Sequence, residues 1–289
     1  MNNLVLSYLL ALLDILPKRH RRNLFLGGGA VVMLGVFGSV GLCGQDLNTD
    51  PESYKFRVIG QFWYATPDAS IAGSSSEDTI SFDKTLGFQE YSTFNASVDW
   101  HFKRKHHLLF GISPNQSTRT AVLQQTITFR DQTFLAGSSV TGELKNYSFA
   151  PGYRYDIIHR PSGHLGILVQ INLLDIKASI TGAALQTGQT KVTTASGSLF
   201  APLPVGGPDV RFYFAKNHLY VDGNLKGMYF FGYGNFISTE GKVGLRLGRH
   251  IDLVGGYELG SHLAIHGTDS RLDIRQTQRG PTGGLAFNF

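Results

Sequence analysis

The chain has 289 residues, of which only 16% are charged and 35 are glycine, against about 25% charged residues in an average soluble protein. The formal net charge is +5, but the residues after position 44 carry only +2 of it, which is too weak and too scattered to indicate nucleic-acid binding. The mean hydropathy of −0.05 does not exclude a membrane β-barrel, because only every second strand residue of such a barrel faces lipid.

The N-terminal part has the order of a secretory signal: basic residues over 18–22, an apolar run over 24–43 and small residues before a polar stretch. We predict a signal peptide or export segment over 1–45, cleaved within 41–45, and a second domain over 46–289. The apolar residues 1–17 indicate that the true start lies further downstream. An uncleaved membrane helix is the alternative. Lipoprotein processing is disfavoured, because Leu42 precedes Cys43 where a small residue is required. Removal of this segment would leave the chain without cysteine.

From Tyr54 onward, apolar residues alternate with polar ones, as they do in strands that have one face in lipid. The first two runs, 54–64 and 93–102, are long enough for tilted membrane strands. The same pattern returns over 108–112, 147–157, 165–180, 210–214, 219–231, 243–247, 251–259 and 283–289. Within 165–180 the apolar parity changes after Ile171, which predicts a β-bulge.

Four connections are short (103–106, 159–163, 215–218 and 248–250), and five are longer or polar (near 66–87, 114–139, 183–197, 232–238 and 263–270). Their alternation predicts ten antiparallel strands, or eight if weak segments merge. An even number closes without an exposed edge, as a membrane requires. We expect Ile127 and Phe129 to lie on a hairpin that projects beyond the membrane. A soluble β-sandwich is the alternative, but it would show a polar outer face.

The parity opposite to the aromatics carries charges of both signs, which a barrel would point into its lumen. The predicted lumen-lining residues are Lys55, Arg57, Asp99, His101, Arg154, Asp156, Lys177, Arg211, Asp222, Lys226, Lys242, Arg246, Asp252 and Glu258. In a ten-stranded barrel they form either an ion-paired plug or the lining of a narrow solute path.

Catalytic candidates are weak. Ser261, His262, His266, Asp269 and Ser270 share the last long loop, where a histidine paired with a carboxylate could activate a hydroxyl. No cofactor or metal site is predicted, because His262 and His266 share a face only on a helix. His106 and His107, at a short turn, are expected at the membrane interface.

A terminal Phe closing an alternating strand resembles the assembly signal of outer-membrane barrels, carried here by Phe287 and Phe289. Together with Thr79–Phe88 and a basic, His-containing turn, it resembles uncharacterised porin-like or OmpW-like barrels of Gram-negative bacteria. That resemblance implies residence in the outer membrane among lipids and lipopolysaccharide, assembly through the C-terminal strand, and passage of small solutes. OmpW-like proteins have eight strands and are implicated in the passage of small hydrophobic molecules. We expect a non-enzymatic barrel with a structural or narrow passage role; the alternative is a surface hydrolase of lipid A or peptides.

Overall fold

The computed structural model describes residues 50–289 except 73–79, 89, 131, 187–188, 231–233 and 266–272. They belong to one compact unit, Asp46–Phe289. The predicted signal peptide and its cleavage region lie outside the described residues. Among the described residues no helix is long and apolar enough to span a bilayer.

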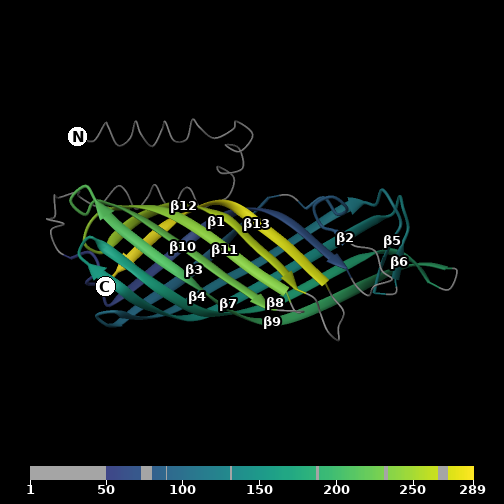
Figure 1. Ribbon diagram of the computed structural model, residues 1–289. Helices are drawn as coiled ribbons and strands as arrows, with labels where there is room; N and C mark the ends of the chain where they lie inside the picture. Colours follow the sequence, from purple (N-terminus) through teal and green to yellow (C-terminus); the bar gives the residue numbers. More distant parts are fainter. Residues whose placement is uncertain are drawn as a thin grey trace, which may run out of the picture. The chain divides into compact units, whose positions relative to one another are not determined.

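The described part is built from antiparallel strands that follow one another around a barrel (Figure 1). The strands are β1 (Phe56–Ala72), β2 (Ile80–Ser81), β3 (Tyr91–Lys103), β4 (His106–Val122), β5 (Ile127–Phe129), β6 (Gln132–Phe134), β7 (Ser139–Arg160), β8 (Gly163–Gln186), β9 (Gln189–Phe214), β10 (Leu219–Phe230), β11 (Gly234–Arg246), β12 (Ile251–Ile265) and β13 (Asp273–Asn288).

Ten of these strands close the barrel, in the order β8-β7-β4-β3-β1-β13-β12-β11-β10-β9, with β9 pairing back to β8. The first and last strands meet in register from Arg57↔Asn288 to Ala72↔Asp273, so no barrel strand is left as an edge. The predicted ten-stranded antiparallel barrel is confirmed. The short β2, β5 and β6 lie outside the closed ring.

Large apolar side chains cover the outside of the barrel. Phe62, Phe94, Ile112, Val169 and Phe212 are each about half exposed, although charged side chains inside the barrel are buried. A soluble monomer rarely exposes so large an apolar surface, whereas a membrane barrel presents it to lipid. This inverted distribution excludes the water-soluble sandwich.

The four predicted short turns join β3 to β4, β7 to β8, β9 to β10 and β11 to β12 at one end, here called the short-turn end. Gly163 shows how tight they are. Its φ is +130°, and a Cβ at this position would lie 1.9 Å from the carbonyl oxygen of Arg211. Only glycine can occupy this position without backbone movement.

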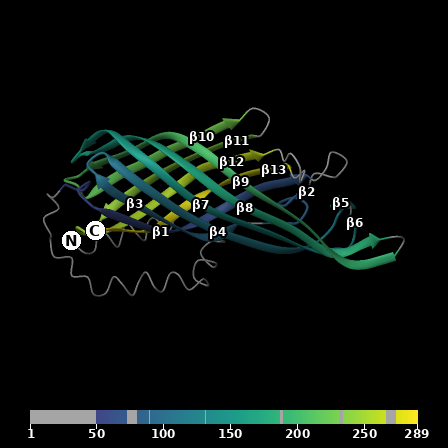
Figure 2. The same ribbon diagram turned by 90° about the horizontal axis from the view of Figure 1, so that it is seen from below.

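All five predicted long connections lie partly in strands, since β1, β4 and β12 continue to Ala72, Val122 and Ile265, and two of the five are mostly strand. Residues 183–186 and 189–197 belong to β8 and β9, which pair as far as Gln186↔Gln189 and extend past the other strands (Figure 2). Residues 234–238 likewise belong to β11. Their Ser-, Thr- and Gly-rich composition indicated loops, but here such residues serve strands that face water on one side.

The predicted β-bulge in β8 is also wrong. The β8–β9 register is continuous from Gly163↔Phe212 onward, and the irregularity lies instead on β7, between Asp156 and Ile158. Even-numbered residues of β8 face inward along the strand. The environment of the outer face changes instead. Apolar side chains face outward before residue 172 (Ile167, Val169 and Ile171), whereas the charged Lys177 faces outward after it.

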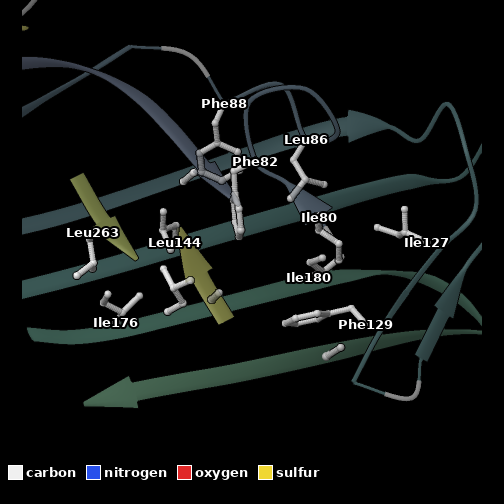
Figure 3. Packing of buried hydrophobic residues seen from close by; sticks show 14 of the residues in the cluster. Ile80, Phe82, Leu86, Phe88, Ile127, Phe129, Leu144, Ile176, Ile180 and Leu263 are labelled. Atoms are coloured by element: carbon white, nitrogen blue, oxygen red, sulfur yellow. The ribbon is translucent and has the colours of Figure 1, made fainter. Parts of the chain in front are cut away.

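Beyond this change the lumen is filled by apolar side chains, as in a soluble protein. Leu144, Ile176 and Ile180 from the barrel strands contact Ile80, Phe82, Leu86 and Phe88 from the connection after β1, together with Ile127 and Phe129 of β5 (Figure 3). This apolar cap occupies the end opposite the short turns, here called the extended end. Ile127 and Phe129 lie, as predicted, on a hairpin beyond the lipid-facing part of the barrel, because β6 of the β5–β6 hairpin pairs with the extended end of β8. Both side chains are buried in the cap rather than exposed.

Candidate functional site

The predicted lumen residues do not share one place. Arg57, Asp99, Arg154, Asp156, Arg211, Arg246 and Asp252 are buried toward the short-turn end, and Asp222 is joined to them by its ion pair with Arg211. Lys226, Lys242 and Glu258 line a cavity further in. Two predicted positions are corrected. Lys55 precedes β1 and is exposed. Lys177 lies on the outer face of β8, where it pairs with Asp175, because β8 contains no bulge.

Arg154 of β7 is the centre of a buried ion cluster. Its guanidinium contacts Asp156 on the same strand (2.9 Å), Asp209 of β9 (3.1 Å) and Asp99 of β3 (3.2 Å). A buried guanidinium is tolerated when each of its N–H groups finds an acceptor. Arg154 therefore links three inner walls of the barrel across the lumen.

Arg57 and Arg211 extend this cluster to the opposite wall. Arg57 donates to Asp252 (2.8 Å) and Asn288 (2.7 Å). Arg211 pairs with Asp222 at 2.5 Å. The ring of Tyr220 lies between the two guanidinium groups, 5.2 Å from Arg57 and 5.5 Å from Arg211. Both contacts are within the range of cation–π attraction.

The segment before β1 completes the cluster. Glu52 is fully buried and contacts His164 (3.0 Å) and Arg211 (3.4 Å), while the hydroxyl of Tyr54 donates to Asp99 (2.9 Å). Burial raises the pKa of Glu52, but the guanidinium of Arg211 and the hydrogen bond from His164 outweigh it and hold that pKa below its usual range. No local pattern indicates Glu52, and the alternation from Tyr54 predicted an outward ring there because the strand begins only at Phe56.

Two buried histidines each bridge two carboxylates. His107 contacts Asp99 through Nδ1 (2.7 Å) and Asp156 through Nε2 (3.1 Å). His164 contacts Glu52 and, through Nε2, Asp209 (2.9 Å). A ring that donates to both of its carboxylates is doubly protonated, but Nδ1 of His107 also lies 3.1 Å from the guanidinium of Arg154, which can only donate. The expected interfacial position of His107 is wrong: it is fully buried in the lumen, whereas His106 faces outward beside Tyr153.

A cavity of about 310 Å³ lies between the ion cluster and the apolar cap. Amide and charged side chains together make up about half of the residues that line it. Among them, Gln61 Oε1, Asn115 Oδ1, Asn146 Oδ1, Asn224 Oδ1 and Gln276 Nε2 have no hydrogen-bond partner within the described part of the chain. The cavity is of the size that takes a small molecule, and its wall favours a polar one.

The catalytic candidates are not assembled in the described structure. His262 lies on β12, where Nδ1 contacts the hydroxyl of Thr277 at 3.0 Å. Its neighbour Leu263 faces the lumen, so His262 faces outward. His266, Asp269 and Ser270 lie outside the described residues, and Ser261 belongs to β12, where it pairs with Gln278 of β13.

The barrel is similar to solved outer-membrane proteins. The outer membrane protease OmpT from Escherichia coli aligns with a TM-score of 0.54 and 9% identity, over 81% of this chain and 96% of that chain. The fold is that of an outer-membrane β-barrel. The translocator domain of the autotransporter NalP from Neisseria meningitidis (TM-score 0.42, 11% identity, 82% of this chain and 90% of that chain) and the toluene transporter TodX from Pseudomonas putida (0.36, 9%, 86% and 93%) also align.

No protein-family model and no curated protein sequence matches the chain. At 9% identity the likeness to OmpT concerns the fold and carries no activity to this chain. Together with the exposed apolar belt, the fold is that of a protein of the bacterial outer membrane.

Proposed function

We propose that this protein is a non-enzymatic, structural outer-membrane barrel whose lumen is closed and whose extended end presents ordered β-structure at the cell surface. The observation that carries the proposal is the double closure of the lumen. Arg57, His107 and Asp252 are 2% exposed or less at one end, and Phe129 and Phe134 are as deeply buried at the other. An open pore requires a continuous water-filled path, which these packed layers interrupt.

A narrow passage for small solutes is the second candidate, and the amide-lined cavity supports it. Unpaired amide groups would be costly in a dry interior, and a polar solute could satisfy them. This chemistry argues for a polar solute rather than the hydrophobic molecules that an OmpW-like relationship would imply. The ten strands also differ from the eight that this resemblance implies.

Conductance in planar bilayers tests the choice. We expect the wild-type protein to show no steady open state, because the ion cluster and the apolar cap both block ion flow. The double variant Glu52→Ala/Tyr54→Ala removes the segment's contacts with His164, Arg211 and Asp99, and should add brief, small openings at most, since the cap remains. Liposome swelling with sugars and amino acids of increasing size should be absent.

A steady conductance of the wild-type protein, or swelling that falls with solute size, would overturn the structural role in favour of passage. Heat-dependent gel migration of each variant verifies that the barrel has folded. The proposed partners are the lipids and lipopolysaccharide around the apolar belt, and the assembly machinery, which would recognise the closing strand through Phe287 and Phe289.

A further inference from the structure

Three histidines meet at the short-turn end of the lumen. His101 of β3, His107 of β4 and His159 of β7 each offer a ring nitrogen, and the three nitrogens lie within 4.8 Å of one another. Asp156 Oδ2 lies beside two of them, 3.1 Å from His107 Nε2 and 3.2 Å from His159 Nδ1. We propose that these four side chains bind one divalent transition-metal ion of the zinc class.

The donor set has the composition that such an ion prefers. Imidazole nitrogens with one carboxylate oxygen suit zinc, nickel and copper, and four donors complete a tetrahedral zinc shell. Asp156 Oδ2 already accepts contacts from two rings, so an ion placed among these groups replaces protons and keeps the carboxylate's role. The stacked rings of His101 and His107, with centroids 4.2 Å apart, must tilt when both bind it.

Groups behind the ligands orient them for metal binding. Asp99 lies 2.7 Å from His107 Nδ1, which leaves Nε2 directed at Asp156. The Nδ1–H of His101 donates to the carbonyl oxygen of Tyr54 (3.2 Å), so Nε2 carries the lone pair. That Nε2 is buried and has no hydrogen-bond partner in the described structure. Carboxylate or carbonyl partners behind ligating histidines are typical of metal sites.

Charge and access also favour a cation. Glu52, Asp99, Asp156 and Asp209 outnumber the arginines that pair with them, Arg154 and Arg211. When His107 and His164 are protonated they supply the remaining two positive charges, and a divalent ion among these groups would take the place of the proton on His107. His101 and His159 are partly exposed residues near the short turns, so an ion can arrive from that end without crossing the amide-lined cavity.

Metal titration of the untagged barrel, folded in detergent and stripped with a chelator, tests the site. Calorimetry with Zn²⁺ should give one ion per chain, and Co²⁺ should give the strong visible absorption of a four-coordinate site. His101→Gln and His159→Gln should each weaken Zn²⁺ binding at least tenfold. Asp99→Asn, a change behind His107, should weaken it about 10–100-fold.

The matched controls are His106→Gln and His218→Gln. Both histidines lie at short turns but outside the cluster: His106 faces Tyr153, and His218 contacts the carbonyl oxygens of its own turn. Binding in these two variants should equal that of the wild type. Less than one ion per chain, or binding that survives both His101→Gln and His159→Gln in folded protein, would overturn the proposal.

Discussion

At the scale of single residues, the barrel interior is held by charged groups whose hydrogen bonds replace those lost with water. The effect of such groups on stability depends on whether the ion pair is complete or has lost one partner. A complete buried ion pair is close to neutral compared with apolar packing, but removal of one partner leaves the other charge buried and uncompensated. The ion cluster should therefore affect the free energy of unfolding most when a single charged member is removed.

Arg57→Met should reduce the free energy of unfolding by about 3–5 kcal/mol, because Asp252 then remains as a fully buried, uncompensated carboxylate. The measurement is urea unfolding in lipid vesicles under reversible conditions. Lys177→Met is the matched control: its pair with Asp175 is exposed, so the expected change is about 0–1 kcal/mol. Similar losses in both variants would contradict the burial of the Arg57 pair.

The buried carboxylate of Glu52 predicts that the free energy of unfolding depends on pH. Its pKa is lower in the folded chain than in the unfolded chain, so its stabilising contribution is complete above the unfolded value of about 4.3 and is lost as the pH falls through the folded value. The difference in unfolding free energy between wild type and Glu52→Gln should therefore be large at pH 7 and shrink below about pH 4.3.

The comparison variant for this titration is Glu143→Gln, which removes a partly exposed carboxylate paired with Lys145 at the extended end. Its effect on the unfolding free energy should be small at pH 7 and at pH 3. A difference between wild type and Glu52→Gln that stayed constant across this range would show that the Glu52 carboxylate is not bound to Arg211 and His164.

At the scale of an element, β8 crosses between two environments without changing its register. Its residues 163–172 have a polar inner face and a lipid-facing outer face, while residues 174–184 have an apolar inner face. The first part has the length that a tilted membrane strand needs. The reversal of polarity therefore locates the boundary of the membrane on this strand.

This boundary predicts that a lysine substitution on the outer face of β8 is destabilising on the membrane side and tolerated beyond it. Ile167→Lys puts a charge in the middle of the lipid-facing part and should cost about 2–4 kcal/mol, whereas Thr181→Lys on the same outward parity faces water and should cost less than about 1 kcal/mol. Unfolding in vesicles measures both. Equal costs would mean that β8 does not leave the membrane between these positions.

Strand alternation and short basic turns were sufficient to predict the ten strands and their order, because both signals are local. The polarity change after Ile171 was misinterpreted because a shifted register and a changed solvent produce the same pattern along the chain. His107 could have been found: Leu108, Phe110 and Ile112 fix the outward parity of β4, which leaves His107 inward. Glu52 and the pairing of His164 with Asp209 depend on contacts between distant strands, which no local pattern records.

At the scale of the whole molecule, the barrel has two closures of different chemistry. The short-turn end is closed by ion pairs and bridging histidines, and the extended end by packed apolar side chains. Between them lies a polar cavity that neither closure fills. The proposed metal site belongs to the first closure, and the β-structure that we propose lies at the cell surface belongs to the second.

The two closures are weakened by different conditions: the apolar cap by cooling or urea, and the ion cluster by acid. Hydrophobic packing weakens on cooling and in urea, whereas buried carboxylates lose their attraction to arginine when acid protonates them. Chilling therefore loosens the cap and leaves the ionic end intact, and acid does the reverse. Temperature and pH can therefore be used to weaken the packing at one end of the barrel without weakening the other.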